Sequence, residues 1–344
     1  MANFDFLLEI DIFRKSLSEQ KAAIKDFWKK GGQILEGSGV SLRPLPEDWT
    51  DLRHNYFSVL FTATFFILKV PLPRLRLYAR LNHCLRSWVT ACDNLLDNEL
   101  KEMLLTSLPE NAATFKSVHT VLTVDRIFFS FLLDGLRDGT ITHDEMEKLL
   151  RVSLSSLSAS GIEEAGEEGG VDCFLPPEEV LQKIHLAKTG RLFTSPLAAP
   201  VALGDITDNA ALENISSGLC QFGLACQVLD DLSDLGMDLA NRKHNYLASL
   251  IMHSNDLYER QLLEDTVNSI FSGDNAARDD IHLYMRFPIA AGLAQKEALS
   301  RFNISLEYLA GGGIPFSSSG KQAFIRTLTA ILGHPDLLVS LRGQ

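Results

Sequence analysis

Residues 219–238 read LCQFGLACQVLDDLSDLGMD, and this stretch decides the predicted fold. Its first part, up to Cys226, is mostly apolar, which is typical of a helix buried in a core. Asp230, Asp234 and Asp238 then follow at intervals of four residues, so they share one helix face. Carboxylates that emerge from a buried helix are costly unless they are paired or bound to a metal. The stretch therefore predicts a core helix that ends at a cation-binding site.

The first acidic segment of the chain, DNLLDNE at 93–99, also follows an apolar helical run, and the Asp-rich end of residues 219–238 is the second acidic segment. Asp93 and Asp97 lie one helical turn apart, and a divalent cation with oxygen ligands would offset their repulsion. Taken alone, this segment is better explained as a solvated acidic helix end. Two such segments could face each other across a helical bundle and hold several Mg²⁺ ions, which would then bind a diphosphate.

Helical periodicity dominates the rest of the chain, and almost no sustained apolar and polar alternation supports a sheet. The predicted fold class is therefore all-α, with one domain spanning residues 1–344. The segment 153–177 is different, because it runs from a Ser-rich stretch through EEAGEEGG at 163–170. It cannot bury much apolar surface, and we expect a mobile surface loop there.

Charge and composition limit the classes of partner. The chain has 344 residues, with 32 Lys and Arg against 44 Asp and Glu, a net charge of −12. Such a chain offers no basic field for nucleic acid, and it suits an anionic substrate only through a divalent cation. The longest apolar stretch, 56–68, is shorter than the roughly 20 residues of a membrane span. The N-terminus lacks signal-peptide features and the five Cys have no CxxC spacing, so we expect a cytoplasmic protein.

Four motifs stand in a fixed order along these apolar helices: DNLLD at 93–97, KTGRLF at 188–193, QVLDDLSD at 227–234 and Arg242-Lys243. Each piece alone is common. The ordered set resembles the class I isoprenoid synthases of the trans-prenyl diphosphate synthase type, which include polyprenyl synthetases and related terpene synthases. The resemblance spans roughly residues 74–250. It implies a bundle of about ten or more helices around a central cavity, and a homodimer.

The resemblance also implies a Mg²⁺-dependent enzyme that ionises an allylic prenyl diphosphate. Three Mg²⁺ ions, or Mn²⁺ in their place, would bind the diphosphate and stabilise it as a leaving group. Its C–O bond would then break and leave an allylic cation in an apolar cavity. The implied metal ligands are Asp93, Asp97, Asp230 and Asp234, with Asp231 and Asp238 as additional candidates. The implied catalytic groups are Lys188, Arg242 and Lys243, which would take the charge of the diphosphate, and Gln227, whose amide dipole would face the cation.

Further substrate contacts follow from the same resemblance. Thr189 and Arg191 accompany Lys188 in the basic motif, whereas Trp88 and Val89 lie about one turn before Asp93, where the family sets the depth of its product tunnel. Phe128 is a candidate for the cavity wall. Ordinary core packing is the alternative explanation for Trp88 and Phe128.

The chain departs from chain-elongating members at positions that matter for function. Those members carry an Arg-Arg pair after the first motif and a Gly-Gly-Lys-Arg segment near the N-terminal side, which bind isopentenyl diphosphate. Here Lys101-Glu102-Met103 and Gly31-Gly32-Gln33-Ile34 stand instead, and Asn94 replaces the second Asp of the first motif. We therefore expect a terpene-synthase-like enzyme that cyclises, rearranges or transfers the prenyl cation.

Two alternatives stay open. The first is chain elongation with isopentenyl diphosphate, which would require basic side chains beside the first motif; the candidates are Arg74, Arg76, Arg80 and Arg126. The second is a non-catalytic partner subunit, which predicts a degraded second motif, whereas Asp230, Asp231 and Asp234 are all present.

Overall fold

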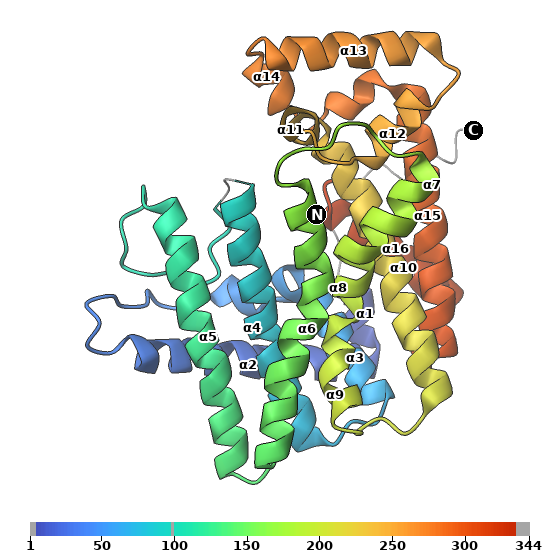
Figure 1. Cartoon of the computed structure of the whole chain (residues 1–344). Coiled ribbons are helices and arrows are strands. Elements are labelled where there is room, and N and C mark those ends of the chain that lie inside the picture. Colours follow the sequence, from blue (N-terminus) through green and yellow to red (C-terminus); the bar gives the residue numbers. More distant parts are fainter. Residues whose placement is uncertain (1–4, 98–99, 335–344) are drawn as a thin grey trace. The chain divides into compact units, whose positions relative to one another are not determined.

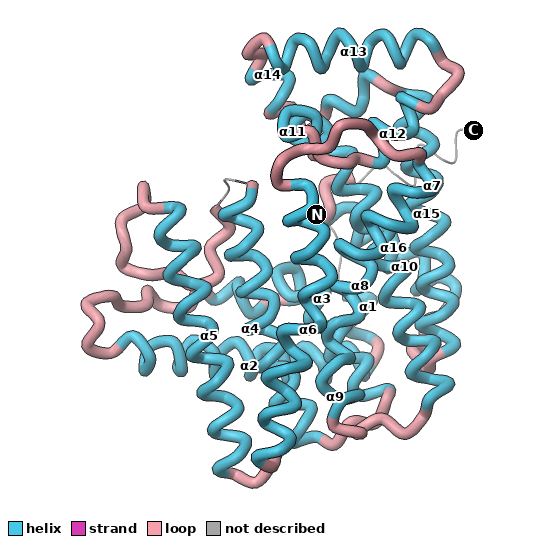
Figure 2. The backbone as a smooth tube through the Cα atoms, viewed as in Figure 1, coloured by secondary structure: helices cyan, strands magenta, loops and turns pink. Residues whose placement is uncertain are grey.

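A computed structural model describes residues 5–97 and 100–334 of the chain, and the regular elements in these ranges are helices (Figure 2). The all-α fold class is thereby confirmed. The described residues divide into two compact units. The N-terminal unit holds residues 5–153 and 196–209, and the C-terminal unit holds residues 154–195 and 210–334. Each unit is described by itself, and the single-domain organisation stays a prediction.

In the N-terminal unit, α4 packs along α5, and α2 packs against α3, α4 and α5 (Figure 1). Phe27, Phe65 and Tyr78 are fully buried in its core. The elements of this unit are α1 (Asp5–Glu9), α2 (Asp11–Leu35), the 3-10 helix η1 (Glu47–Thr50), α3 (Leu52–Ile67), α4 (Leu72–Leu96), α5 (Ala113–Arg137), the first part of α6 (His143–Glu167) and α9 (Ala198–Ala202).

The C-terminal unit is built around α10, as its apolar sequence predicts. Phe222 of this helix contacts the rings of Phe302 and Phe324, with centroids 5.5 and 5.9 Å away. The elements are the end of α6, α7 (Pro177–Glu179), the π-helix η2 (Val180–Gly190), α8 (Arg191–Thr194), η3 (Ser195–Leu197), α10 (Asn209–Ser233), α11 (Leu235–Asn241), α12 (Tyr246–Met252), α13 (Leu257–Phe271), α14 (Asn275–Arg278), η4 (Leu283–Arg286), α15 (Pro288–Gly311) and α16 (Ser318–Ile331).

Two glycines of α10 allow its neighbours to approach closely. A Cβ atom at Gly223 would lie 2.7 Å from the carbonyl oxygen of Thr189, and one at Gly218 would lie 2.7 Å from the side chain of Leu309. Any larger residue would therefore push η2 or α15 away from α10. The close approach at Gly223 holds η2, and with it the basic motif, against the helix that ends in the second acidic segment.

The segment expected to be a loop at 153–177 is helical over much of its length. The helix α6 continues to Glu167, so only residues 168–176 connect it to α7. Its start is fixed by a capping box, in which Thr142 N donates to Glu145 Oε2 at 2.8 Å and Glu145 N donates to Thr142 Oγ1 at 3.3 Å. The expectation of a loop from residue 153 was wrong. The many charged and Ser residues indicated a loop, but they belong to a helix that buries few of its side chains.

None of the helices in residues 5–97 and 100–334 combines the length and the hydropathy that crossing a membrane requires.

Candidate functional site

The second acidic segment lies at the carboxyl end of α10. Asp230 and Asp234 are exposed there, whereas Asp231 is 2% exposed. The helix geometry explains this split, because residues 230 and 234 share a face and residue 231 points about 100° away, into the unit. The carboxylates of Asp230 and Asp234 therefore face solvent, while that of Asp231 belongs to the core.

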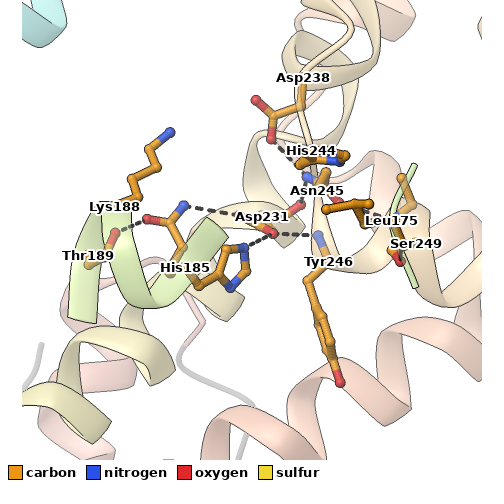
Figure 3. A network of polar contacts seen from close by, with 12 residues as sticks. Leu175, His185, Lys188, Thr189, Asp231, Asp238, His244, Asn245, Tyr246 and Ser249 are labelled. Carbon is orange, nitrogen blue, oxygen red and sulfur yellow. Dashed lines mark hydrogen bonds and ion pairs between the residues drawn. The ribbon is translucent and has the colours of Figure 1, made fainter. Parts of the chain in front are cut away.

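Asp231 is the centre of a buried polar network (Figure 3). Its Oδ2 lies 3.0 Å from Nε2 of His185 and accepts the backbone N–H of Tyr246 at 2.5 Å, and its Oδ1 accepts from Gln227 Nε2 at 3.0 Å. Burial alone would raise the pKa of Asp231, but His185 and the N–H donors hold it below its usual value. Both oxygens of Asp231 are thus engaged within the protein, and metal ligation by Asp231 stays a prediction.

Two further side chains complete this network. The hydroxyl of Thr189 donates to Oε1 of Gln227, so both ends of the Gln227 amide are engaged within the protein. Asn245 donates from Nδ2 to the backbone oxygen of Asp231 at 2.7 Å and to Oδ2 of Asp238 at 2.8 Å. Burial and the neighbouring Asp231 carboxylate raise the pKa of Asp238 well above its usual value. Gln227 and Asp238 are thus held by contacts within the protein, Asp238 through its Oδ2, and the roles predicted for both residues stay predictions.

Lys188 and Lys243 both reach Glu164, which stands near the end of α6. Lys188 Nζ lies 2.6 Å from Glu164 Oε1, and Lys243 Nζ lies 3.7 Å from Glu164 Oε2. Burial alone would lower the pKa of Lys188, but Glu164, followed by Asp238 and Asp231, raises it. Lys188 is therefore charged, and it lies within electrostatic reach of the second acidic segment.

Arg242 and Arg191 are placed differently from these two lysines. Arg242 ends α11 in a left-handed conformation with φ of 54°. Its guanidinium donates to Val171 O at 2.8 Å and to Asp172 at 3.2 Å, beside a cavity of about 420 Å³ that it shares with Phe174 and other side chains. Arg191 is exposed at the start of α8. The turn at residue 242 thus directs Lys243 towards Glu164 and Arg242 towards the 171–172 loop.

In the N-terminal unit, the first acidic segment ends α4. Asp93 is exposed, Asp97 is partly exposed, and Asn94 is 6% exposed. The Asn94 amide donates to Lys101 O at 3.1 Å and accepts from Lys101 N at 2.9 Å. Asn94 therefore anchors the segment that follows the helix.

The ring of Trp88 on α4 stacks on that of Phe128 on α5, with centroids 5.4 Å apart and an interplanar angle of 22°. Phe128 is 2% exposed, and Trp88 Nε1 donates to Val121 O at 3.1 Å. These contacts are those of core packing, the alternative given above for both residues. Val89 is partly exposed on the next position of α4.

The arginines proposed for isopentenyl diphosphate are engaged elsewhere in the N-terminal unit. Arg74 bridges Glu145 at 2.6 Å and Asp205 at 2.8 Å, Arg76 pairs with Glu19 at 2.9 Å, and Arg80 pairs with Asp26 at 2.6 Å. Even the nearest of them precedes Asp93 by 13 residues of continuous helix, about 20 Å along the axis. Arg126 donates to the backbone oxygen of Leu122 at 2.7 Å. None of the four is paired with the first acidic segment by these contacts.

No group of three or more His, Cys, Asp or Glu side chains is arranged to hold a metal ion within the described ranges. Two exposed carboxylates one turn apart are nevertheless what Mg²⁺ requires, because it keeps several waters and is commonly held by one or two carboxylates together with substrate phosphates. Asp230 and Asp234 fit this donor set.

Comparison with solved structures defines the class of fold. The chain has the isoprenoid synthase fold of the trans-prenyl diphosphate synthases. It is similar to a decaprenyl diphosphate synthase from Rhodobacter capsulatus (14% identity, 94% of this chain and 99% of that chain, TM-score 0.64). It is also similar to a polyprenyl synthase from Caulobacter crescentus complexed with calcium and isoprenyl diphosphate (15% identity, 96% of this chain and 97% of that chain, TM-score 0.64). A third similar structure is a geranylgeranyl pyrophosphate synthetase from Pyrococcus horikoshii (17% identity, 93% of this chain and 98% of that chain, TM-score 0.56). No protein-family model and no curated protein sequence matches the chain.

Sequence reasoning missed three residues of the site. Glu164 was assigned to a loop, although a helix places it against both lysines. His185 lies three residues before Lys188 of the basic motif, and it is 1% exposed against Asp231. Asn245 caps α12 by accepting from Ala248 N at 3.0 Å, and an Asn directly before an apolar run is a sequence signal for such a cap.

Proposed function

We propose that the protein is a Mg²⁺-dependent isoprenoid synthase that ionises an allylic prenyl diphosphate. One observation carries the proposal. In the C-terminal unit, two exposed carboxylates, Asp230 and Asp234, stand at the end of the core helix. The charged amine of Lys188, which shares Glu164 with Lys243, lies within electrostatic reach of Asp231 and Asp238 in the same acidic segment. Carboxylates for a metal next to amines for an anion are the groups that a metal diphosphate needs.

Each group has a proposed role. Asp230 and Asp234 would hold Mg²⁺, which supplies the positive charge that stabilises diphosphate as a leaving group. Lys188 and Lys243 would bind the diphosphate oxygens and take part of the charge that develops on them. Asp231 and Gln227 would keep α10 and η2 in register, so that these groups are already oriented when substrate arrives. Asp93 and Asp97 stay predicted metal ligands.

Chain elongation is the fate of the prenyl cation that the comparisons favour, because the similar solved structures are described as polyprenyl and geranylgeranyl diphosphate synthases. Cyclisation or transfer to another acceptor is the second candidate. It is favoured by the arginine contacts, since Arg74, Arg76 and Arg80 are neutralised by carboxylates far along α4 from Asp93. The two fates differ only after ionisation, so they share the site described above.

The test is an incubation of purified protein and Mg²⁺ with geranyl, farnesyl and geranylgeranyl diphosphates, each with and without isopentenyl diphosphate. Products are extracted and identified by mass spectrometry. Products longer by five carbons that require isopentenyl diphosphate would establish elongation. Hydrocarbon or alcohol from the allylic substrate alone would establish the second candidate. An Asp230→Ala, Asp234→Ala double variant should lose at least about a hundredfold in rate in either case. Absence of any product with every substrate would contradict the proposal.

A further inference from the structure

The carboxylate of Glu164 stands between the two amines proposed to bind diphosphate. Its Oε1 contacts Lys188 Nζ at 2.6 Å, and its Oε2 faces Lys243 Nζ at 3.7 Å. All three side chains are largely buried, with 15%, 25% and 13% of the Glu164, Lys188 and Lys243 side chains exposed. A carboxylate that offers one oxygen to each of two amines presents the same kind of acceptors to them as one phosphoryl group.

The charge around these amines is unfavourable for a free anion. Glu163 and Glu167 lie on the same end of α6, and burial raises the pKa of both. Asp231 and Asp238 act on Lys188 from the other side. Several carboxyl groups therefore lie within electrostatic reach of Lys188, and a free diphosphate would meet a lysine pair that Glu164 already occupies.

The position of Glu164 on its helix makes the contact displaceable. Glu163, Glu164 and Glu167 stand in the last turn of α6, which contains no basic residue. Carboxylates are disfavoured at a helix carboxyl end, because the last carbonyl groups carry partial negative charge. The lysines offset that cost in the structure, and an anion with its own neutralising cation can take the lysines over.

We propose that Glu164 occupies the place of a phosphoryl group between Lys188 and Lys243, so that the site excludes free diphosphate and admits it only together with a divalent cation. The inference rests on the proposed function. It assigns to Glu164 the role of a specificity residue, which makes metal and diphosphate binding mutually dependent. The cation would lower the charge of the incoming anion and add its attraction to Asp230 and Asp234, which together offset the loss of the Glu164 ion pairs.

The test is calorimetric titration with inorganic diphosphate, in EDTA and in Mg²⁺, of the wild type, Glu164→Gln and Glu168→Gln. Glu168 is exposed and has no contact with either lysine, so its variant removes the same charge without opening the site. We expect the wild type and Glu168→Gln to bind diphosphate only in Mg²⁺. Glu164→Gln should bind it in EDTA at least about tenfold more tightly than either. The added change Lys188→Met in Glu164→Gln should abolish that gain.

A Glu164→Gln protein that binds in EDTA no better than Glu168→Gln would overturn the inference, while binding by the wild type in Mg²⁺ would leave the proposed function standing. Absence of diphosphate binding by every protein in Mg²⁺ would overturn both. Thermal unfolding of each variant checks that it is folded. If Glu164→Gln is unfolded, Glu164→Ala takes its place with the same expected gain.

Discussion

Asn94 in the N-terminal unit and Asp231 in the C-terminal unit hold the same place in their acidic segments, one residue after the first exposed aspartate. Both side chains are buried, and both bind a backbone group beyond the end of their helix. Their partners differ. Asn94 meets one N–H and one carbonyl oxygen, both of Lys101, whereas Asp231 meets the N–H of Tyr246, the amide N–H of Gln227 and the ring of His185.

The difference in hydrogen-bond partners explains why position 94 has an Asn and position 231 an Asp. An amide suits Lys101 because it both donates and accepts, while a carboxylate suits a pocket of donors. The Asn at position 94 therefore matches its two partners, the N–H and the carbonyl oxygen of Lys101. The residues on either side remain the candidates for metal in both segments: the exposed Asp93 with the partly exposed Asp97, and the exposed Asp230 with Asp234. This comparison, with a second one between two buried histidines, leads to three predictions about stability.

The largest effect is expected for Asp231→Asn. The new NH₂ group would face donors, so at least one buried donor loses its acceptor and His185 loses its carboxylate. We expect the free energy of unfolding to fall by about 3 kcal/mol. Urea unfolding measures this value. Asp230→Asn, one residue away and exposed, is the control and should change it by less than about 0.5 kcal/mol. Equal losses for the two variants would show that Asp231 is not the anchor.

A smaller loss is expected for Asn94→Asp, which restores the acidic pattern of the segment. The carboxylate cannot donate to Lys101 O, and it places a charge where the side chain is 6% exposed. We expect a loss of about 2 kcal/mol in urea unfolding and no gain in Mg²⁺ affinity by calorimetry. Tighter Mg²⁺ binding at unchanged stability would instead identify position 94 as a ligand position.

The sequence predicted the helices and the exposed members of both segments, because periodicity and spacing determine which residues share a helix face. It could not predict the anchors. Whether Asp231 faces solvent or His185 depends on η2, which is distant in sequence, and the role of Asn94 depends on a loop contact. Glu164 was missed for a related reason, since composition indicated a loop and the partner lysines lie on other elements. The local sequence pattern thus predicts which residues share a helix face, whereas tertiary contacts determine the role of each residue on that face.

The smallest effect concerns a second pair of buried residues, His83 in the N-terminal unit and His185 in the C-terminal unit. His185 lies against Asp231, whereas His83 of α4 meets the edge of Phe27, with ring centroids 4.6 Å apart. Burial, and then the nearby charge of Arg86, lowers the pKa of His83 to about 3. A buried histidine without a carboxylate partner of this kind should make the protein sensitive to acid.

The sign of the effect follows from proton binding. Above pH of about 6.5 His83 is neutral in both states, whereas below it the unfolded chain takes up a proton that the folded protein cannot accept. Stability is therefore lost as the pH falls from about 6.5 towards 3, and the contribution of His83 at pH 5.5 is about 1.4 kcal/mol. Urea unfolding at pH 7.5 and 5.5 should show His83→Asn losing less stability than the wild type by this amount. His54→Asn, at an exposed histidine on α3, should keep the wild-type difference between the two pH values. If both variants keep the wild-type difference in stability between the two pH values, His83 takes up its proton in the folded state. The comparison between His83 and His185 would then be wrong.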